Sequence, residues 1–148
     1  MRKMKNSKGF TLMEMLIVVA IIAVLVAIAI PTFTTSLNKA RVATDEANIR
    51  SGYASFMAEM LANDKFDITK TYYLQKDGTV AEGTTDRDYV CVGNQADENL
   101  EIAGQKVGKW NAGPTTKVTY KATKATDTDK VTVTITVGTP TANPGQGG

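Results

Sequence analysis

Histidine is absent from this chain, and cysteine occurs once, at Cys91. Without histidine there is no Ser-His or Cys-His pair for nucleophilic catalysis, and no imidazole ligand for a metal. One cysteine cannot form a disulfide within the chain. The domain must therefore be held by packing and hydrogen bonds alone, and we expect Cys91, in the apolar stretch 89–92, to be a small buried side chain.

Other site motifs are also missing from the sequence. There is no glycine-rich phosphate loop, no nucleophile elbow and no regular metal-ligand spacing. The paired acids Asp64/Asp67 and Asp127/Asp129 lack the alternating oxygen ligands and closing glutamate of an EF-hand. We interpret them as solvated loop residues. The sequence predicts no cofactor and no metal, and favours a structural protein over an enzyme.

A net positive charge is found only at the start of the chain. The formal net charge of the 148-residue chain is +2, but Arg2, Lys3, Lys5 and Lys8 stand at the start with no acid among them. Removing these four of 17 basic residues leaves 13 against 15 acidic ones, a net charge of −2. The basic residues therefore indicate membrane topology, with the N-terminus inside, and not a nucleic-acid surface.

Phe10–Ile30 is a run of 21 residues that is apolar apart from Thr11 and Glu14. At about 1.5 Å per residue a helix of this length spans roughly 31 Å, close to the ~30 Å hydrocarbon thickness of a bilayer. A rival interpretation is a cleaved secretory signal ending at Ala27-Ile28-Ala29. The run is longer than the usual ~7–15 residues of such a signal, and the signal leaves Glu14 unexplained.

Glu14 is the unusual residue of this run, because a carboxylate within a bilayer costs free energy. Its side chain could extend to the nearby headgroups. Alternatively, cleavage between Gly9 and Phe10 would free an α-amino group at Phe10, four residues from Glu14. The geometry favours a pair between chains over a pair within one chain.

The segment Lys8-Gly9-Phe10-Thr11-Leu12-Met13-Glu14 resembles the prepilin cleavage motif of the type IV pilin family. The resemblance covers about the first fifty residues and includes Pro31 just beyond the apolar run, where it is expected to kink the helix. It implies cleavage after Gly9 by a prepilin peptidase, an N-methylated Phe10, and a role for Phe10 and Glu14 in assembly. The missing disulfide resembles pilins of Gram-positive bacteria.

The expected fold is the α+β type IV pilin fold. A long N-terminal helix spans the membrane in its first half and packs in its second half against a C-terminal antiparallel β-sheet. The expected parts are a leader (1–9), a transmembrane and assembly helix (10–31), an amphipathic continuation (32–63), a helix-to-sheet loop (64–87), the sheet (88–138) and a loose tail (139–148).

The pattern after Pro31 predicts that the helix continues to about Ala62. One face is expected to be apolar, formed by Val42, Ile49, Tyr53, Phe56, Met57, Met60 and Leu61. The opposite face is expected to be polar, formed by Lys39, Arg41, Asp45, Glu46, Asn48 and Arg50.

Strands are predicted at Thr71–Leu74, Arg87–Gly93, Lys106–Trp110, Lys117–Lys124 and Lys130–Val137, with a turn at Asp77-Gly78. In the last two strands apolar residues alternate with threonine or lysine, which predicts half-buried strands. The loop 125–129 would join them as an antiparallel hairpin. Val131, Val133, Ile135 and Val137 are expected to share the face that covers the helix.

These features predict a pilin that is inserted in the cytoplasmic membrane and polymerised into an extracellular filament for adhesion, motility or biofilm formation. The resemblance implies further copies of the chain, minor pilins, an assembly ATPase and a platform protein as partners. One alternative is a pseudopilin of a type II secretion or DNA-uptake system. Another is a monomeric, membrane-anchored extracellular binding module in which Glu14 is incidental.

Overall fold

The computed structural model describes residues 9–64 and 66–139. The chain divides into two compact units, Met1–Leu37 and Asn38–Gly148, which are considered separately below. Nearly all of the expected leader, and the expected tail beyond Thr139, lie outside the described residues. The division of the chain into six functional parts stays a prediction.

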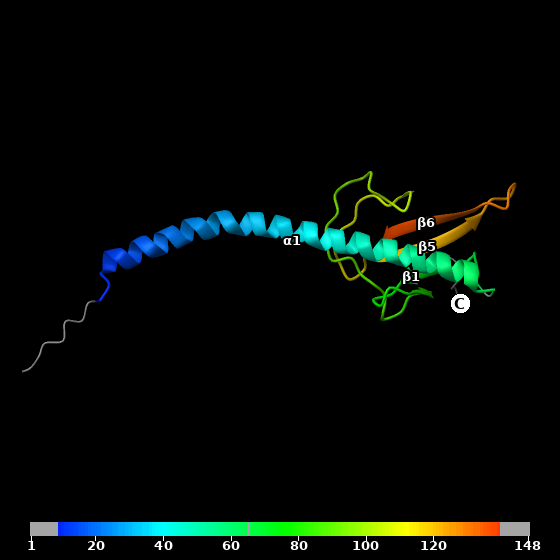
Figure 1. Cartoon of the computed structure of the whole chain (residues 1–148), viewed down its shortest axis with the longest axis horizontal. Helices are drawn as coiled ribbons and strands as arrows, with labels where there is room; N and C mark the ends of the chain where they lie inside the picture. Colours follow the sequence, from blue (N-terminus) through cyan, green and yellow to red (C-terminus); the bar gives the residue numbers. More distant parts are fainter. Residues whose placement is uncertain (1–8, 65, 140–148) are drawn as a thin grey trace, which may run out of the picture. The chain divides into compact units, whose positions relative to one another are not determined.

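Helix α1 runs from Leu12 to Ala62 and is followed by short and long strands (Figure 1). The strands are β1 (Thr71–Leu74), β2 (Val80–Glu82), β3 (Glu101–Ile102), β4 (Gln105–Lys106), β5 (Lys117–Lys124) and β6 (Val131–Gly138). The predicted helix end near Ala62, strand β1 and the strand pair β5–β6 are confirmed. Strand β2 falls in a range that the sequence pattern left without a strand.

In the first unit, the α1 side chains from Leu12 to Leu37 are exposed along the whole segment. They include large apolar residues on every side, because the sequence there has no polar face. Within the described chain, α1 is the one helix long and apolar enough to cross a membrane. An exposed apolar surface of this extent requires lipid or protein to cover it.

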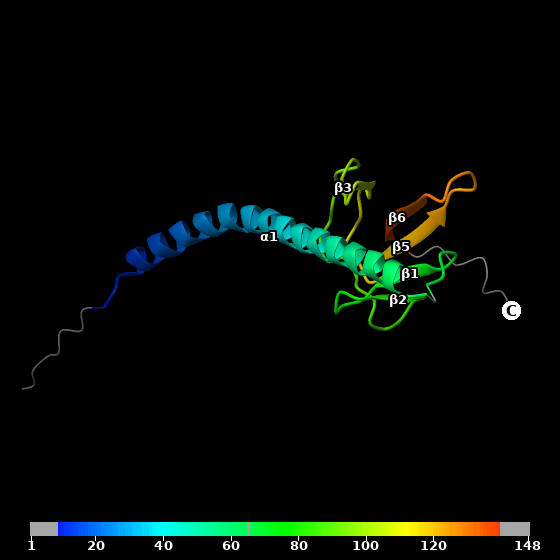
Figure 2. The same cartoon turned by 45° about the vertical axis from the view of Figure 1, so that its right-hand side comes forward.

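In the second unit, four strands form an antiparallel sheet in the order β2-β1-β5-β6, and β3 pairs with β4 as a separate hairpin (Figure 2). Tyr72 of β1 pairs with Tyr120 of β5, and Tyr120 pairs with Ile135 of β6. The predicted β5–β6 hairpin is therefore present, with Lys117 opposite Gly138 and Lys124 opposite Val131. Strands β2 and β6 are the two edges of this sheet.

The core of the second unit lies between α1 and the sheet. Phe56 of α1 is fully buried and stacks on Tyr120, with ring centroids 5.6 Å apart. The Tyr120 hydroxyl also donates a hydrogen bond of 2.7 Å to the backbone carbonyl of Ile49. Burying side chains of this size stabilises the fold by roughly 1.5–3 kcal/mol each. Cys91 is 1% exposed, as predicted.

Two predicted strands are wrong. Segment 87–93 forms only single bridges, Asp88 with Gln75 and Val90 with Lys117. It passes between two strands and then turns onto the helix, so its apolar alternation does not extend into a ladder. In the range predicted as Lys106–Trp110, strand β4 ends at Lys106, and Trp110 forms an isolated bridge with Gln95.

The predicted apolar faces also need correction at three positions. Leu61 is 81% exposed, since it lies outside the narrower stripe through Ile49 and Phe56. Asp45 is fully buried and not on the polar face of the helix. Val131 is 39% exposed although its alternation partners Val133 and Ile135 are buried, because it stands at the start of an edge strand.

Candidate assembly site

The predicted cleavage junction lies at the start of the described chain, before α1. Phe10 is 81% exposed, and the space where a side chain on Gly9 would project is empty within 4 Å. The junction therefore has no packing of its own that a peptidase would need to displace. Exposure fits the predicted role of Gly9 and Phe10, which stays a prediction.

Glu14 makes a reciprocal pair of hydrogen bonds with Thr11 at the start of α1. The backbone N–H of Thr11 donates to Oε2 of Glu14 over 2.7 Å, and the backbone N–H of Glu14 donates to Oγ1 of Thr11 over 3.3 Å. This is a capping box, in which two backbone donors at the helix start gain side-chain acceptors. Glu14 thus has a local role in the single chain that the sequence interpretation missed, although Thr-x-x-Glu before an apolar run is a recognised signal for it.

Pro31 lies inside α1, which continues through it without a break. Its ring removes one backbone donor from the helix. The hydroxyls of Thr34 and Thr35 both donate to the carbonyl of Pro31, over 2.9 and 3.0 Å, and Thr32 donates to the carbonyl of Ile28. Such hydroxyl bonds to helix carbonyls are associated with bending. The predicted kink itself stays a prediction.

Asp45 is the most heavily bonded side chain of α1 in the second unit. Its carboxylate accepts hydrogen bonds from the Tyr89 hydroxyl (2.6 Å), the Val92 backbone N–H (3.1 Å) and the Gly93 backbone N–H (2.8 Å). Burial, together with this carboxylate, raises the pKa of Tyr89. The helix therefore holds the irregular segment 89–93 through one buried acid.

The spacing of the buried residues along the helix indicates that Asp45 is buried too, which the interpretation of the sequence missed. Residue 45 lies three positions after Val42 and four before Ile49, which is the spacing of the buried stripe itself. A charged residue at such a position is buried only with several hydrogen-bond donors around it.

Burial is the main cause that raises the pKa of Cys91 to about 12, and the charge of Asp45 adds to it. The Cys91 thiol therefore stays protonated.

Two glycines allow close approach around the helix. A Cβ on Gly93 would lie 2.5 Å from the backbone nitrogen of Val42, and a Cβ on Gly52 would lie 2.3 Å from the Tyr120 hydroxyl oxygen. One turn before Val42, the side-chain amide of Asn38 bonds the backbone of Asn94 in both directions, over 2.8 and 2.9 Å. Segment 92–94 is therefore fixed to the helix by backbone contacts that a larger side chain at position 93 would prevent.

A second buried acid, Asp88, joins the sheet to the loop after β2. It forms a 2.7 Å ion pair with Lys117 and accepts hydrogen bonds from Gln75 and from the backbone of Thr85. Burial acts to raise the pKa of Asp88, but Lys117, Gln75 and Thr85 together outweigh it, so that the pKa lies below its ordinary value. The carboxylate is therefore held in its charged form.

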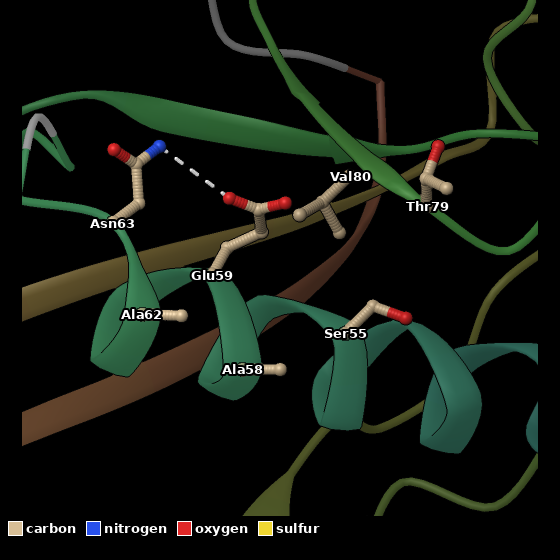
Figure 3. A pocket seen from close by; sticks show the side chains of 7 residues that line it. All are labelled: Ser55, Ala58, Glu59, Ala62, Asn63, Thr79 and Val80. Atoms are coloured by element: carbon tan, nitrogen blue, oxygen red, sulfur yellow. Dashed lines mark hydrogen bonds between the residues drawn. The ribbon is translucent and has the colours of Figure 1, made fainter.

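A shallow groove of about 430 Å³ lies where the turn before β2 passes over the end of α1 (Figure 3). In the close-up, Ser55, Ala58 and Ala62 lie on the helix side of the groove, and Thr79 and Val80 lie on the opposite side. The Ser55 hydroxyl donates to the carbonyl of Gly78 over 2.8 Å, which ties the turn to the helix. In the described part of the chain, no three acids or cysteines gather where they could hold a metal ion.

Known proteins are similar to this chain over about its first third. Residues 4–30 match the family model of the prokaryotic N-terminal methylation motif. The type IV narrow pilus major component of Thermus thermophilus is 51% identical over 52 residues, covering 33% of this chain and 45% of that protein. The type IV wide pilus major component of the same organism is 54% identical over 37 residues, covering 25% of this chain and 28% of that protein.

The chain thus spans less than half the length of these curated relatives. No solved structure matches it. The first third of the chain is therefore similar to type IV pilins, and the structure adds a long N-terminal helix that packs in its second half against an antiparallel sheet. The resemblance predicted from Gly9, Phe10 and Glu14 is confirmed at the level of the motif, whereas the individual roles of these residues stay predictions.

Proposed function

We propose that the chain is a structural subunit of a type IV pilus. The observation that carries the proposal is the methylation motif at residues 4–30, which includes the start of a helix with exposed apolar side chains on every side. Such a helix suits two environments in turn: the bilayer that holds the precursor, and the helix bundle of a filament. The second unit would form the outer surface.

Processing is the first step of this proposal. The basic residues Arg2, Lys3, Lys5 and Lys8 keep the start of the chain in the cytoplasm. A prepilin peptidase cuts after Gly9, and the new amino group of Phe10 is then methylated. The precursor is a single-pass protein of the cytoplasmic membrane, and the assembled form is extracellular.

Assembly needs an interaction that sets the position of each subunit, because moving a helix from lipid to other helices provides little hydrophobic driving force. We assign this role to the Phe10 amine of one subunit and Glu14 of its neighbour. An amine left without a counter-charge in an apolar bundle would cost several kcal/mol. Since Glu14 already bonds the Thr11 N–H through one oxygen, its other oxygen remains for the neighbour.

The further partners follow from this role: other copies of the chain, minor pilins, an assembly ATPase and a platform protein. Adhesion, motility and biofilm formation are the activities that such a filament would serve. The role is structural and requires no catalysis. The two relatives named above are pilus components, which favours a pilus over a pseudopilus and over a monomeric binding module.

Electron microscopy of sheared surface material, with mass spectrometry of its main protein band, tests the proposal. We expect filaments whose main component is this chain beginning at a methylated Phe10. Short filaments confined to the envelope would favour the pseudopilus. Crosslinking on intact cells that gives no ladder would indicate the monomeric module.

A further inference from the structure

Strand β6 is an edge of the sheet, and in the described chain the strand has no charged residue, proline or bulge along its length. It lies beside β5 on one side, and no strand pairs with its other side in the described chain (Figure 2). Edge strands are usually kept from pairing by charge, proline, a bulge or short length. Val131–Gly138 has none of these, because it is eight residues of alternating valine or isoleucine and threonine, ending in glycine.

The opposite edge differs in length and in charge. Strand β2 is three residues long, and its last residue, Glu82, forms an ion pair with Lys70. It offers too little backbone for a stable pairing and carries a charge at its end. The lack of protection is therefore particular to β6 and not a general property of this sheet.

The register of the hairpin shows which backbone groups of β6 are open. The Ala125 N–H donates to the Lys130 carbonyl, and the pairs of β5 with β6 continue in the same register. Hydrogen-bonded and non-hydrogen-bonded pairs alternate along an antiparallel ladder. Thr132, Thr134 and Thr136 therefore direct their N–H and C=O groups toward β5.

The residues between the threonines direct their N–H and C=O groups away from β5. These residues are Val131, Val133, Ile135 and Val137. Strand β4 lies near β6, but no backbone hydrogen bond joins the two in the described chain. A row of unpartnered donors and acceptors thus lines the edge while the side chains of Val133 and Ile135 stay in the core.

We propose that this edge pairs with the β6 edge of a second copy of the chain, in antiparallel orientation, to join two sheets into one. The register that pairs all four open residues of both copies makes Val133 a hydrogen-bonded pair with the partner's Ile135. Val131 then lies opposite the partner's Val137, and Thr134 lies opposite the partner's Thr134. Every apolar residue meets an apolar residue, and every threonine meets a threonine.

Two observations favour a second copy as the occupant. Lys130 would lie opposite the partner's Gly138, so that the pairing sets no like charges against each other. The side chain of Val131 is 39% exposed in the single chain. In the pair it would gain the partner's Val137, which is partly buried, as a neighbour. The strand is thus complementary to itself in the register that uses all of its open hydrogen-bonding groups.

Pairing about a two-fold axis is closed, because both copies use the same surface. It cannot lengthen a polar filament, and because the two-fold axis also reverses the direction of α1 beside β6, it would instead link subunits of two neighbouring filaments that run in opposite directions. The inference does not depend on the Phe10–Glu14 contact and goes beyond the proposed polymerisation. The proposed β6 pairing and the proposed polymerisation can be disproved independently. Filaments could form without β6 pairing, and β6 pairing could occur without filaments.

Cysteine substitution in the full chain, held in detergent micelles and treated with a mild oxidant, tests the pairing. Directly opposed residues of a non-hydrogen-bonded pair have Cα atoms about 4.5 Å apart, which is within disulfide range. Thr134→Cys should therefore form a disulfide-linked dimer. Thr123→Cys is the matched control, because residue 123 is an exposed threonine on the same face but on β5.

In the paired sheet the two copies of residue 123 would be three strand spacings apart across the sheet, about 14 Å, and displaced along the strands as well, which is beyond disulfide range. We expect about tenfold more dimer for Thr134→Cys than for Thr123→Cys, given this difference in separation. The native Cys91 is buried in both variants and contributes equally to the background. Equal yields for the two variants would overturn the proposal.

A mixed experiment tests the register. Thr132→Cys and Thr136→Cys chains should each give little dimer alone, because each residue is displaced along the strand from its own copy in the partner. A mixture of the two should give a linked dimer, since position 132 lies opposite the partner's Thr136 position. If the separate chains link as well as the mixture does, the contact is random collision and the proposed pairing is wrong.

Discussion

The buried carboxylate of Asp45 accepts a hydrogen bond of 2.8 Å from the backbone N–H of Gly93. The residues are 48 positions apart, and the bond fixes an irregular segment to the helix in a chain that cannot form a disulfide. Gly93 in turn approaches the helix backbone at Val42 too closely for a side chain. This contact therefore supplies, by hydrogen bonding, a long-range link between helix and loop.

Asp45→Asn should weaken this link. The asparagine amide keeps the size of the side chain but replaces one acceptor oxygen with a donor that would face backbone N–H groups. Hydrogen bonds to charged groups contribute about 1.5–3 kcal/mol, and we expect a loss of that order in the free energy of unfolding. Denaturant unfolding of the detergent-solubilised chain measures it.

Glu46→Gln is the control for Asp45→Asn. Glu46 is the next residue of α1, and among the described residues its side chain forms an i,i+4 pair with Arg50, with its carboxylate 3.9 Å from the guanidinium. Such a pair contributes roughly 0.3–0.5 kcal/mol. Similar losses for the two variants would contradict the anchoring role of Asp45.

Gly52→Ala should destabilise the second unit although alanine is the better helix former. Helix propensity alone favours alanine by about 1 kcal/mol. The new methyl would lie 2.3 Å from the Tyr120 hydroxyl oxygen and 2.6 Å from Cδ1 of Leu74, both in buried side chains. Thermal unfolding should show a lower midpoint for Gly52→Ala, whereas Ser51→Ala, at the exposed neighbouring position, should leave the midpoint unchanged or raise it. A raised midpoint for Gly52→Ala would mean that the helix and sheet are not in close contact there.

The Asp88–Lys117 pair should make stability depend on pH in the acid range. The folded-state pKa of Asp88 lies below its unfolded value of about 3.8, so the charged carboxylate favours the folded state. The contribution is fully present above about pH 4 and is lost as the pH falls through the folded pKa. Asp88→Asn should lower the free energy of unfolding at neutral pH and reduce its decline in acid.

Unfolding curves of the wild type and Asp88→Asn, recorded at several pH values from neutral to acid, give this difference. Asp129→Asn serves as the control, because Asp129 pairs with Lys124 at a side chain that is 95% exposed. Its curve should follow the wild type across the range. An Asp88→Asn curve parallel to the wild type in acid would rule out a contribution from Asp88.

Gly9→Val tests processing. A β-branched side chain beside the scissile bond should obstruct a peptidase that accepts glycine, and the full-length precursor should accumulate in the membrane without filaments. N-terminal sequencing of the membrane fraction provides the measurement. A chain that still begins at Phe10 would contradict the predicted requirement for Gly9, and a mature chain beginning at Ile30 would support a secretory signal instead.

Glu14→Gln separates the two roles of this side chain. Glutamine keeps the capping hydrogen bond to the Thr11 N–H, since glutamate and glutamine both serve in a capping box. It removes only the charge that would meet the Phe10 amine of a neighbouring subunit. Insertion and cleavage should persist while incorporation into filaments is lost, so membrane fractions should hold trimmed protein and sheared fractions none. Normal filaments built from Glu14→Gln alone would exclude the charge pair.

The sequence predicted the elements whose period extends over many residues. The helix to Ala62 and the strands β5 and β6 follow directly from apolar spacing, and Tyr120 and Ile135 are buried as their alternation requires. The methylation motif could also be recognised in the sequence, because the Gly9-Phe10 junction, Glu14 and the start of the apolar run lie close together. Local patterns were sufficient in each of these cases.

The predictions that were wrong concern residues whose structure depends on contacts with distant parts of the chain. Asp45 appears polar in the sequence, and only the donors at Tyr89, Val92 and Gly93 make its burial favourable. Segment 87–93 has the apolar alternation of a strand. Its successive residues, however, form hydrogen bonds or bridges first with the end of β1, then with the start of β5, and then with the helix. No local pattern encodes such a path, so a single sequence could not distinguish it from a strand.

Trp110 is the single tryptophan of the chain; it is 4% exposed, and its indole nitrogen is buried without a hydrogen-bond partner in the described residues. Its backbone bonds Gln95 in both directions, just beyond the segment that Asp45 holds. Its fluorescence therefore provides a native optical signal for that loop. Water reaching the indole would shift the emission to longer wavelength, so that release of the loop could be followed in time without attaching a dye.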